Sequence, residues 1–200
     1  MTKPRILLTR RWPEAVEARL AASYDVTLNE ADVPMDAAAL VQAMRGHDAL
    51  CPTVTDRITR EITLTEGRRV RIIGNYGAGF EHIDLDAARG AGIIVTNTPD
   101  VLTDATADIA MTLILMTTRR AGEGERELRA GEWSGWRPTH LLGRSLRGKV
   151  LGLVGYGRIA RAVAERAKAF EMEVAIHSRS RAEDVPESAY HASLDSLLRV

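Results

Sequence analysis

The fold of this chain is decided by residues 149–160, which read Lys149-Val150-Leu151-Gly152-Leu153-Val154-Gly155-Tyr156-Gly157-Arg158-Ile159-Ala160. The apolar run predicts a β-strand, and the glycine pattern that follows it opens a helix, which is the context that a dinucleotide site requires. Gly155 permits a tight turn, Gly157 lets the backbone approach a pyrophosphate, and Ala160 keeps the helix close to the strand. Free N–H groups at the helix start favour phosphate charge. The stretch therefore predicts a dinucleotide-binding unit rather than an ordinary strand–helix turn.

The residues after this turn indicate which dinucleotide is bound. The helix carries its apolar residues at spacings of three and four, and residues 173–177 form the next strand: the apolar helix positions are Ile159, Val163, Ala167 and Phe170. An NAD site usually places Asp or Glu at the end of that strand, about 20 residues past the glycines. This chain has Ser178-Arg179-Ser180-Arg181 there, and guanidinium groups bind a 2′-phosphate well. We therefore expect NADP(H), with NAD(H) as the alternative; both arginines could instead simply point into water.

Composition limits the classes of protein that the chain can belong to. Its 200 residues are enough for one large domain or two small ones, and 45% of them are hydrophobic. Lys+Arg and Asp+Glu are both 27, so the zero net charge argues against nucleic-acid or anionic-membrane partners. The single cysteine, Cys51, excludes an internal disulfide framework and a thiolate metal cluster, and we predict no metal site. Without a signal peptide or a spanning apolar run, we expect a soluble, cytoplasmic protein.

The first hundred residues alternate between short apolar strands and helical stretches. Such alternation predicts a parallel sheet with helices on both faces. The predicted strands are residues 6–9, 25–28, 48–51, 70–73 and 93–96, and the predicted helices are residues 13–22, 36–44, 57–64 and 84–89.

A break at residues 97–100 separates this region from a long predicted helix. We place the domain boundary near Pro99 and expect Thr103 or Asp104 to cap a helix that runs to about residue 120. Ile109, Leu113 and Met116 form one apolar stripe on that helix. Met111 and Met116 are expected to pack in the core.

Four ordered motifs together resemble the D-2-hydroxyacid dehydrogenase family, and most closely its glyoxylate/hydroxypyruvate reductase branch. They are Asn-Tyr-Gly-Ala-Gly-Phe-Glu-His-Ile-Asp at 75–84, Val-Thr-Asn-Thr-Pro-Asp-Val-Leu-Thr at 95–103, Gly-Glu-Trp at 131–133, and the glycine turn. The resemblance covers essentially the whole chain. It implies an α/β fold: a flavodoxin-like substrate domain at residues 1–99, then the first part of a Rossmann dinucleotide-binding domain at residues 100–200.

The resemblance also implies roles for individual residues and a homodimer. Backbone N–H groups of the Gly77–Gly79 loop would bind the substrate carboxylate, and small residues there let an anion reach the main chain. The loop at residues 52–55 would form the opposite wall. The implied substrate-binding residues are Val54, Thr55, Ala78 and Gly79. The implied cofactor-binding residues are Gly155, Tyr156, Gly157, Arg158, Ile159, Ser178, Arg179, Ser180 and, at the nicotinamide end, Thr106.

The family's catalytic Arg, Glu and His are expected to lie beyond Val200, so we predict no catalytic residue within the chain. We also expect the second sheet to contain two strands, leaving its next edge unpaired. Among other candidates, Cys51 is expected to be a small buried strand residue, His82 a surface or capping residue, and His177 to lie at the adenosine end of the cofactor. His47 and His191 are expected to be solvated, and His140 to pack at a subunit interface.

These observations predict an oxidoreductase that transfers a hydride between NADP(H) and a small 2-keto acid such as glyoxylate or hydroxypyruvate. Two alternatives remain open. One is a non-catalytic dinucleotide-binding or interaction module of the same family. The other is an NAD-linked enzyme similar to phosphoglycerate dehydrogenase, which Ser178 and Arg179 disfavour because no acidic residue occupies their place.

Overall fold

The computed structural model describes residues 2–200 and divides into two compact units. The first unit extends through Val101, and the second begins at Leu102. Each unit contains its own parallel sheet.

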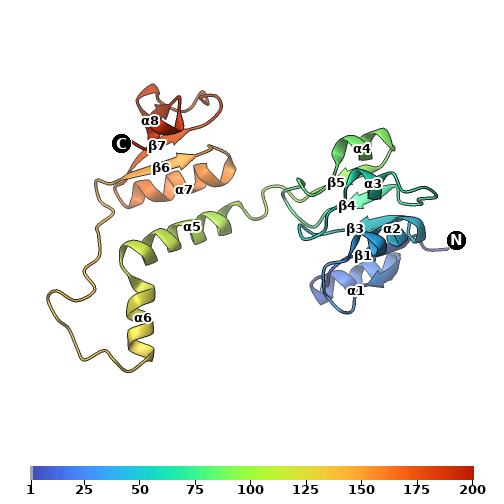
Figure 1. The fold of residues 1–200 in the computed structure, drawn as a ribbon, viewed down its shortest axis with the longest axis horizontal. Coiled ribbons are helices and arrows are strands. Elements are labelled where there is room, and N and C mark those ends of the chain that lie inside the picture. Colours follow the sequence, from blue (N-terminus) through green and yellow to red (C-terminus); the bar gives the residue numbers. More distant parts are fainter. Residues whose placement is uncertain (1) are drawn as a thin grey trace. The chain divides into compact units, whose positions relative to one another are not determined.

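The first unit is a five-stranded parallel sheet with the order β2-β1-β3-β4-β5 (Figure 1). This is the flavodoxin-like order of a doubly wound sheet. Its strands are β1 (Arg5–Leu8), β2 (Asp25–Leu28), β3 (Ala49–Cys51), β4 (Ile72–Gly74) and β5 (Ile94–Thr96). Its helices are α1 (Glu14–Ser23), α2 (Ala37–Gly46), α3 (Arg60–Thr63) and α4 (Leu85–Gly90).

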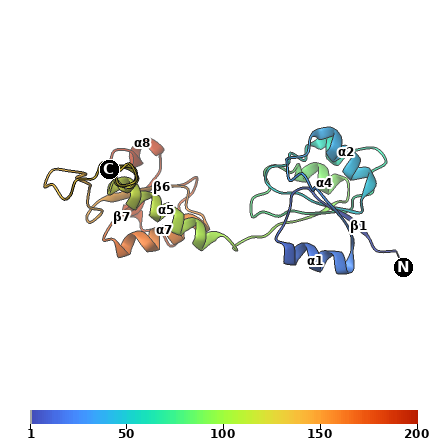
Figure 2. The ribbon, with the colours of Figure 1, turned by 90° about the horizontal axis from the view of Figure 1, so that it is seen from below.

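Both faces of this sheet are covered, as the alternation of strands and helices predicts. Figure 2 shows α1 on one face and α2 and α4 on the other. Leu50 of β3 and Ile73 of β4 are fully buried, and Met44 of α2 and Ile58 pack in the same core. Two aspartates, Asp36 and Asp84, accept hydrogen bonds from helix N–H groups and so fix the starts of α2 and α4.

The second unit is a three-stranded parallel sheet with the order β6-β7-β8. The helices α5 and α7 cover one face, and α8 lies against the other (Figure 2). The strands are β6 (Val150–Val154), β7 (Glu173–His177) and β8 (Tyr190–His191). The helices are α5 (Thr103–Thr118), α6 (Ala121–Arg129), α7 (Arg158–Ala169) and α8 (Leu194–Leu197). The predicted fold class is confirmed, since this order matches the first half of a Rossmann sheet.

Two predictions about the secondary structure of this unit are wrong. The second sheet has a third strand, because Tyr190–His191 pairs with β7. Leu102 occupies the N-cap position of α5, so neither Thr103 nor Asp104 caps it.

The predicted stripe on α5 is exposed, and a different face of the helix is buried. Ile109, Leu113 and Met116 are 60%, 57% and 43% exposed, whereas Ala107 and Met111 pack against Val163 and Ala167 of α7: Met116 is therefore not a core residue. Among residues 2–200, no helix is both long enough and apolar enough to cross a membrane.

Candidate nucleotide and carboxylate sites

The glycine turn joins β6 to α7 as the sequence predicts. Its two glycines are suited to their positions for different reasons, one of backbone conformation and one of space. Gly155 has a φ of +90°, a conformation that residues with a side chain adopt only with strain. Gly157 has an ordinary negative φ, and a Cβ there would meet no heavy atom of the described chain within 4 Å. The backbone requires glycine at 155. At 157 the open space is what a closely approaching phosphate needs.

A cavity of about 510 Å³ lies beside this turn. It brings together the end of β6, the turn and the segment after β7: the lining residues are Val154, Gly155, Tyr156, His177, Ser178, Arg179, Ser180 and Ala182. Gly155 N–H donates to the carbonyl of His177 at 2.7 Å, which ties the turn to the end of β7. None of these lining residues carries a carboxylate.

The segment at residues 178–181 is ordered by its own hydrogen bonds. The Ser178 hydroxyl donates to the carbonyl of Ser180 at 2.7 Å, and the Tyr190 hydroxyl donates to the carbonyl of Ser178 at 3.0 Å. Arg181 donates to the carbonyl of Val185 at 3.3 Å. Arg179 is exposed, and its guanidinium makes no hydrogen bond or ion pair with any residue in the described part of the chain. Its side chain can therefore turn to an anion in the cavity without breaking an existing contact.

Sequence reasoning missed Arg161, which supports a wall of this cavity. Its guanidinium lies 4.4 Å from the centre of the Tyr156 ring and forms an ion pair with Asp184. Four predicted cofactor residues are exposed and are not among those that line the cavity: Thr106, Gly157, Arg158 and Ile159. The position of Arg161 on α7, one helical turn after Gly157, was the signal from which the sequence could have identified it.

In the first unit, the two predicted substrate loops meet at the carboxyl ends of β3 and β4. Thr53 pairs with Tyr76 in an isolated parallel bridge. A Cβ on Gly77 would lie only 3.0 Å from Cγ1 of Val54, so a larger residue at 77 would push the loops apart. The four predicted substrate residues lie on these loops: Val54 and Thr55 are exposed, and Ala78 and Gly79 are half-buried.

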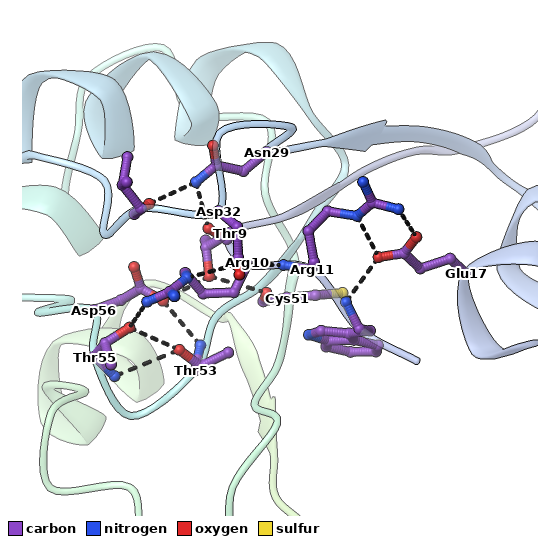
Figure 3. Close-up of polar contacts among 12 residues, drawn as sticks. Thr9, Arg10, Arg11, Glu17, Asn29, Asp32, Cys51, Thr53, Thr55 and Asp56 are labelled. Atoms are coloured by element: carbon purple, nitrogen blue, oxygen red, sulfur yellow. Dashed lines mark hydrogen bonds and ion pairs between the residues drawn. The ribbon is translucent and has the colours of Figure 1, made fainter. Parts of the chain in front are cut away.

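A polar network that sequence reasoning did not find anchors the first of these loops (Figure 3). The carboxylate of Asp56 is fully buried and accepts from the Thr9 hydroxyl at 2.6 Å and from Thr53 N–H at 2.8 Å. Arg10 pairs with Asp32 and donates to the Thr55 hydroxyl at 3.4 Å. The loop is thereby fixed to the end of β1.

The same figure shows a second, tighter pair at the start of α1. Arg11 donates to both oxygens of Glu17, at 3.0 and 2.8 Å, and Trp12 N–H donates to the same carboxylate at 2.7 Å. These bonds hold the pKa of Glu17 below its ordinary value, the Arg11 hydrogen bond being the largest cause. Glu17 is almost wholly buried, so the pair fixes the chain between β1 and α1.

The amide side chains of Asn75 and Asn97 shape the second loop. Asn75 donates to the carbonyls of Gly77 and Gly79, at 3.2 and 2.8 Å. Asn97 donates to the carbonyl of Ala78 at 2.8 Å. Each asparagine directly follows a strand, and the carboxyl ends of parallel strands are where ligands bind, so this position was a usable signal.

The structure excludes one of the two roles expected for His82 and contradicts the expectation for His47. His82 does not cap α4, which Asp84 caps; its Nε2 lies 3.0 Å from Oδ1 of Asn75. Burial lowers the pKa of His82, so the neutral imidazole is favoured. His47 is buried rather than solvated, and its ring nitrogens contact the carbonyl of Ala43 and the hydroxyl of Thr27 at 3.1 Å each.

The remaining candidates have local roles. His140 lies 2.7 Å from Glu127 of α6, and His177 lines the cavity of the second unit. His191 contacts the Ser196 hydroxyl at 2.9 Å. Burial raises the pKa of Cys51 to about 11, so its thiol is protonated and unreactive near neutral pH.

The fold and these sites define a class of α/β protein in which a flavodoxin-like sheet is followed by a Rossmann-type strand–turn–helix. Comparison with known proteins gives the family. Residues 6–189 match the catalytic domain of the D-isomer specific 2-hydroxyacid dehydrogenases, and the chain belongs to that family.

Similar proteins carry related activities. A glycerate dehydrogenase from Hyphomicrobium methylovorum is 41% identical, with 100% of this chain and 63% of that protein covered. A glyoxylate reductase from Aeropyrum pernix is 43% identical, with 100% and 61% covered. The chain thus spans about 60% of the length of these relatives.

Solved structures show the same fold. A putative D-isomer specific 2-hydroxyacid dehydrogenase from Polaromonas superposes with a TM-score of 0.87 at 40% identity, covering 98% of this chain and 62% of that one. An NADPH-dependent glyoxylate/hydroxypyruvate reductase from Sinorhizobium meliloti, solved with NADP and malonate, gives 0.80 at 34% identity, covering 96% and 58%.

Proposed function

We propose that this chain binds NADP(H) through its second unit and the carboxylate of a small 2-keto acid through its first, for reduction to the 2-hydroxy acid. Glyoxylate and hydroxypyruvate are the proposed substrates. The relatives named as glyoxylate reductases support this choice of substrate class. The proposed substrate domain comprises residues 1–99, and the proposed dinucleotide domain residues 100–200.

One observation carries the choice of cofactor. The cavity beside the glycine turn is bordered by Ser178, Arg179 and Ser180 and by no carboxylate among its lining residues. A carboxylate at the end of this second strand would accept from a ribose 2′-hydroxyl and repel a 2′-phosphate. Hydroxyl groups and an unpaired guanidinium instead favour the phosphate.

The bound cofactor would supply the hydride, and the chain's residues would position the two partners. The N–H groups at the start of α7 and the open space at Gly157 accommodate the pyrophosphate. Arg179 and Ser180 are placed to contact the 2′-phosphate. In the first unit, the loops that carry Val54 and Ala78 would hold the substrate carboxylate. We assign no catalytic residue within the chain.

The cofactor assignment is tested with Arg179→Asp. The variant loses a charge-assisted contact with phosphate, worth about 1.5–3 kcal/mol, so NADPH should bind roughly ten- to a hundredfold more weakly while NADH changes little. Calorimetric titration of both cofactors measures the difference. Arg199→Asp makes the same charge change at an exposed arginine that does not line the cavity, and it should leave both affinities unchanged. Equal losses for NADPH and NADH in Arg179→Asp would contradict the 2′-phosphate role.

We also propose that the chain forms a homodimer. The exposed apolar stripe of Ile109, Leu113 and Met116 on α5 supports this, because an apolar face of this kind is commonly covered by another subunit. Sedimentation equilibrium tests it: Leu113→Asp should shift a dimer towards monomer, and a wild-type chain that sediments as a monomer would contradict the proposal.

A further inference from the structure

The strongest inference concerns what makes the loop at residues 77–79 able to bind an anion. Asn75 directly follows β4 and Asn97 directly follows β5, and these two strands are paired neighbours. Asn75 N–H also donates to the carbonyl of Thr96 at 3.0 Å. The two asparagines are therefore placed together under the loop by the sheet itself.

Their amide groups hold every carbonyl of the loop. The carbonyl of Gly77 accepts from Asn75 and from Thr98 N–H, the latter at 3.0 Å. The carbonyl of Ala78 accepts from Asn97, and that of Gly79 accepts from Asn75. No carbonyl in this stretch is left directed at a ligand.

Because peptide groups are planar, the directions of these carbonyls also determine the directions of the neighbouring N–H groups. In a trans peptide the N–H points opposite to the carbonyl of the preceding residue. The N–H groups of Ala78, Gly79 and Phe80 therefore point away from the two asparagines. Within residues 2–200, none of these three N–H groups donates a hydrogen bond. Ala78 and Gly79 are half-buried and Phe80 is exposed, and adjacent N–H groups without an acceptor are suited to an oxyanion such as a carboxylate.

The carbonyls of Gly77 and Gly79 fix which way round the Asn75 amide lies, and His82 is placed to support this orientation. Asn75 is 2% exposed, and its Oδ1 lies 3.0 Å from Nε2 of His82. Because Oδ1 only accepts, Nε2 must carry the hydrogen, and the two N–H bonds of Nδ2 are then directed at the carbonyls. The reverse orientation would place Oδ1 against two carbonyl oxygens, neither of which can donate a hydrogen bond.

We propose that Asn75 and Asn97 are positioning residues for substrate binding: they hold the loop carbonyls back, so that the N–H groups of Ala78, Gly79 and Phe80 receive the substrate carboxylate, and His82 supports Asn75 in this orientation. The inference rests on the proposed function, since it assumes that this loop binds the carboxylate. It adds the side chains that orient the loop's N–H groups for binding a carboxylate.

The test is an NMR titration of the isotope-labelled 200-residue chain with oxamate, an unreactive mimic of a 2-keto acid. In the wild type, the amide signals of Ala78, Gly79 and Phe80 should shift on binding. Asn75→Ala should weaken oxamate binding by about tenfold or more, because the loop peptides are free to turn and the charge-assisted bonds are lost. Asn97→Ala releases one carbonyl and should weaken binding less.

A matched control comes from Asn29, which also donates to two carbonyls, those of Thr9 and Val33, at 2.7 Å each. Asn29→Ala should leave the oxamate affinity unchanged, which separates loss of the loop geometry from general loosening of the unit. Signals of the buried strand residues Leu50 and Ile73 report whether each variant is folded. If Asn75→Ala does not fold, the oxamate affinity of Asn97→Ala tests the proposal on its own.

The outcomes separate this inference from the proposed function. Wild-type binding that persists at full strength in folded Asn75→Ala and Asn97→Ala overturns the role of the asparagines and leaves the carboxylate site in place. A wild-type chain whose Ala78–Phe80 amides do not respond to oxamate overturns the proposed substrate site, and this inference with it.

Discussion

The two units of this chain bury their apolar residues to very different degrees. In the first, Leu8, Leu50 and Ile73 are completely buried between helices on both faces of a five-stranded sheet. In the second, the buried cluster consists mainly of small side chains between α5 and α7, while Leu113 and Val154 are 57% and 69% exposed. The comparison shows that the strands and helices of a unit can be in their expected order while part of their apolar surface is still exposed. Stability should therefore be concentrated in the first unit.

The largest expected effect comes from a substitution at Gly157 of the second unit, and Gly90 of the first unit provides its control. Gly157→Val should abolish binding of both NADPH and NADH, because its side chain fills the space that the pyrophosphate would use. A Cβ at Gly90 of α4 also meets no heavy atom of the described chain within 4 Å, so Gly90→Val is the matched control and should bind both cofactors normally. Cofactor binding that survives in a folded Gly157→Val variant would contradict the assignment of the turn.

The contrast in burial predicts different costs for two leucines. Leu50→Ala removes a fully buried side chain and should lower the free energy of unfolding by about 2–5 kcal/mol. Leu113→Ala, on the exposed face of α5, should cost less than about 0.5 kcal/mol in the monomeric chain. Urea unfolding measures both. A large cost at Leu113 would mean that α5 is covered in solution, which would sharpen the dimer proposal.

A smaller effect should appear as a pH dependence confined to the first unit. The folded pKa of Glu17 lies below its ordinary value of 4.5, so the Arg11–Glu17 pair stabilises the fold above that pH. Its contribution is lost as the pH falls through the lowered pKa. Glu17→Gln should be less stable than the wild type at pH 7, and the gap should close in acid. Glu165→Gln, an exposed partner of Lys168 in the second unit, should change stability little at any pH. A gap for Glu17→Gln that persists in strong acid would rule out the ion pair as its cause.

The smallest effect is a rate of modification. Raising the pKa of Cys51 from 9.0 to about 11 leaves about a hundredth as much thiolate as an ordinary cysteine near pH 8. Iodoacetamide should therefore alkylate the folded chain at least about a hundredfold more slowly than the urea-unfolded chain. Mass spectrometry follows the reaction, and equal rates would show that β3 opens readily.

The sequence predicted the order of elements well, because periodicity identifies residues that share a face. The predicted strands at residues 25–28 and 173–177 match β2 and β7. Periodicity does not say what covers a face, which is why Met116, on the same stripe as Ile109 and Leu113, was wrongly expected to pack in the core. β8 was missed because two residues are too short for any pattern.

The candidate sites were predicted only where a motif marks them. Glycine turns have a recognisable spacing, so the region around Gly155 could be proposed from sequence. Asn75 and Asn97 both lie inside the quoted motifs, but their roles were not foreseen: Asn75 holds carbonyls two and four residues away, and Asn97 reaches Ala78 across 19 residues. Their position immediately after neighbouring parallel strands was informative, but it became a specific prediction only once the strand order was known.

The hydrogen bond from Gly155 N–H to the carbonyl of His177 has a consequence for altering cofactor preference. It joins the glycine turn to the strand end that carries residues 178–180, and both border the cavity proposed for the nucleotide. The side chains of Arg179 and Ser180 make no hydrogen bond or ion pair within residues 2–200, so exchanging them breaks no existing contact, whereas the Ser178 hydroxyl holds the carbonyl of Ser180. If the proposed cofactor site is right, redesign of this chain for NADH begins with the two exposed residues Arg179 and Ser180, and the glycine turn can be left untouched.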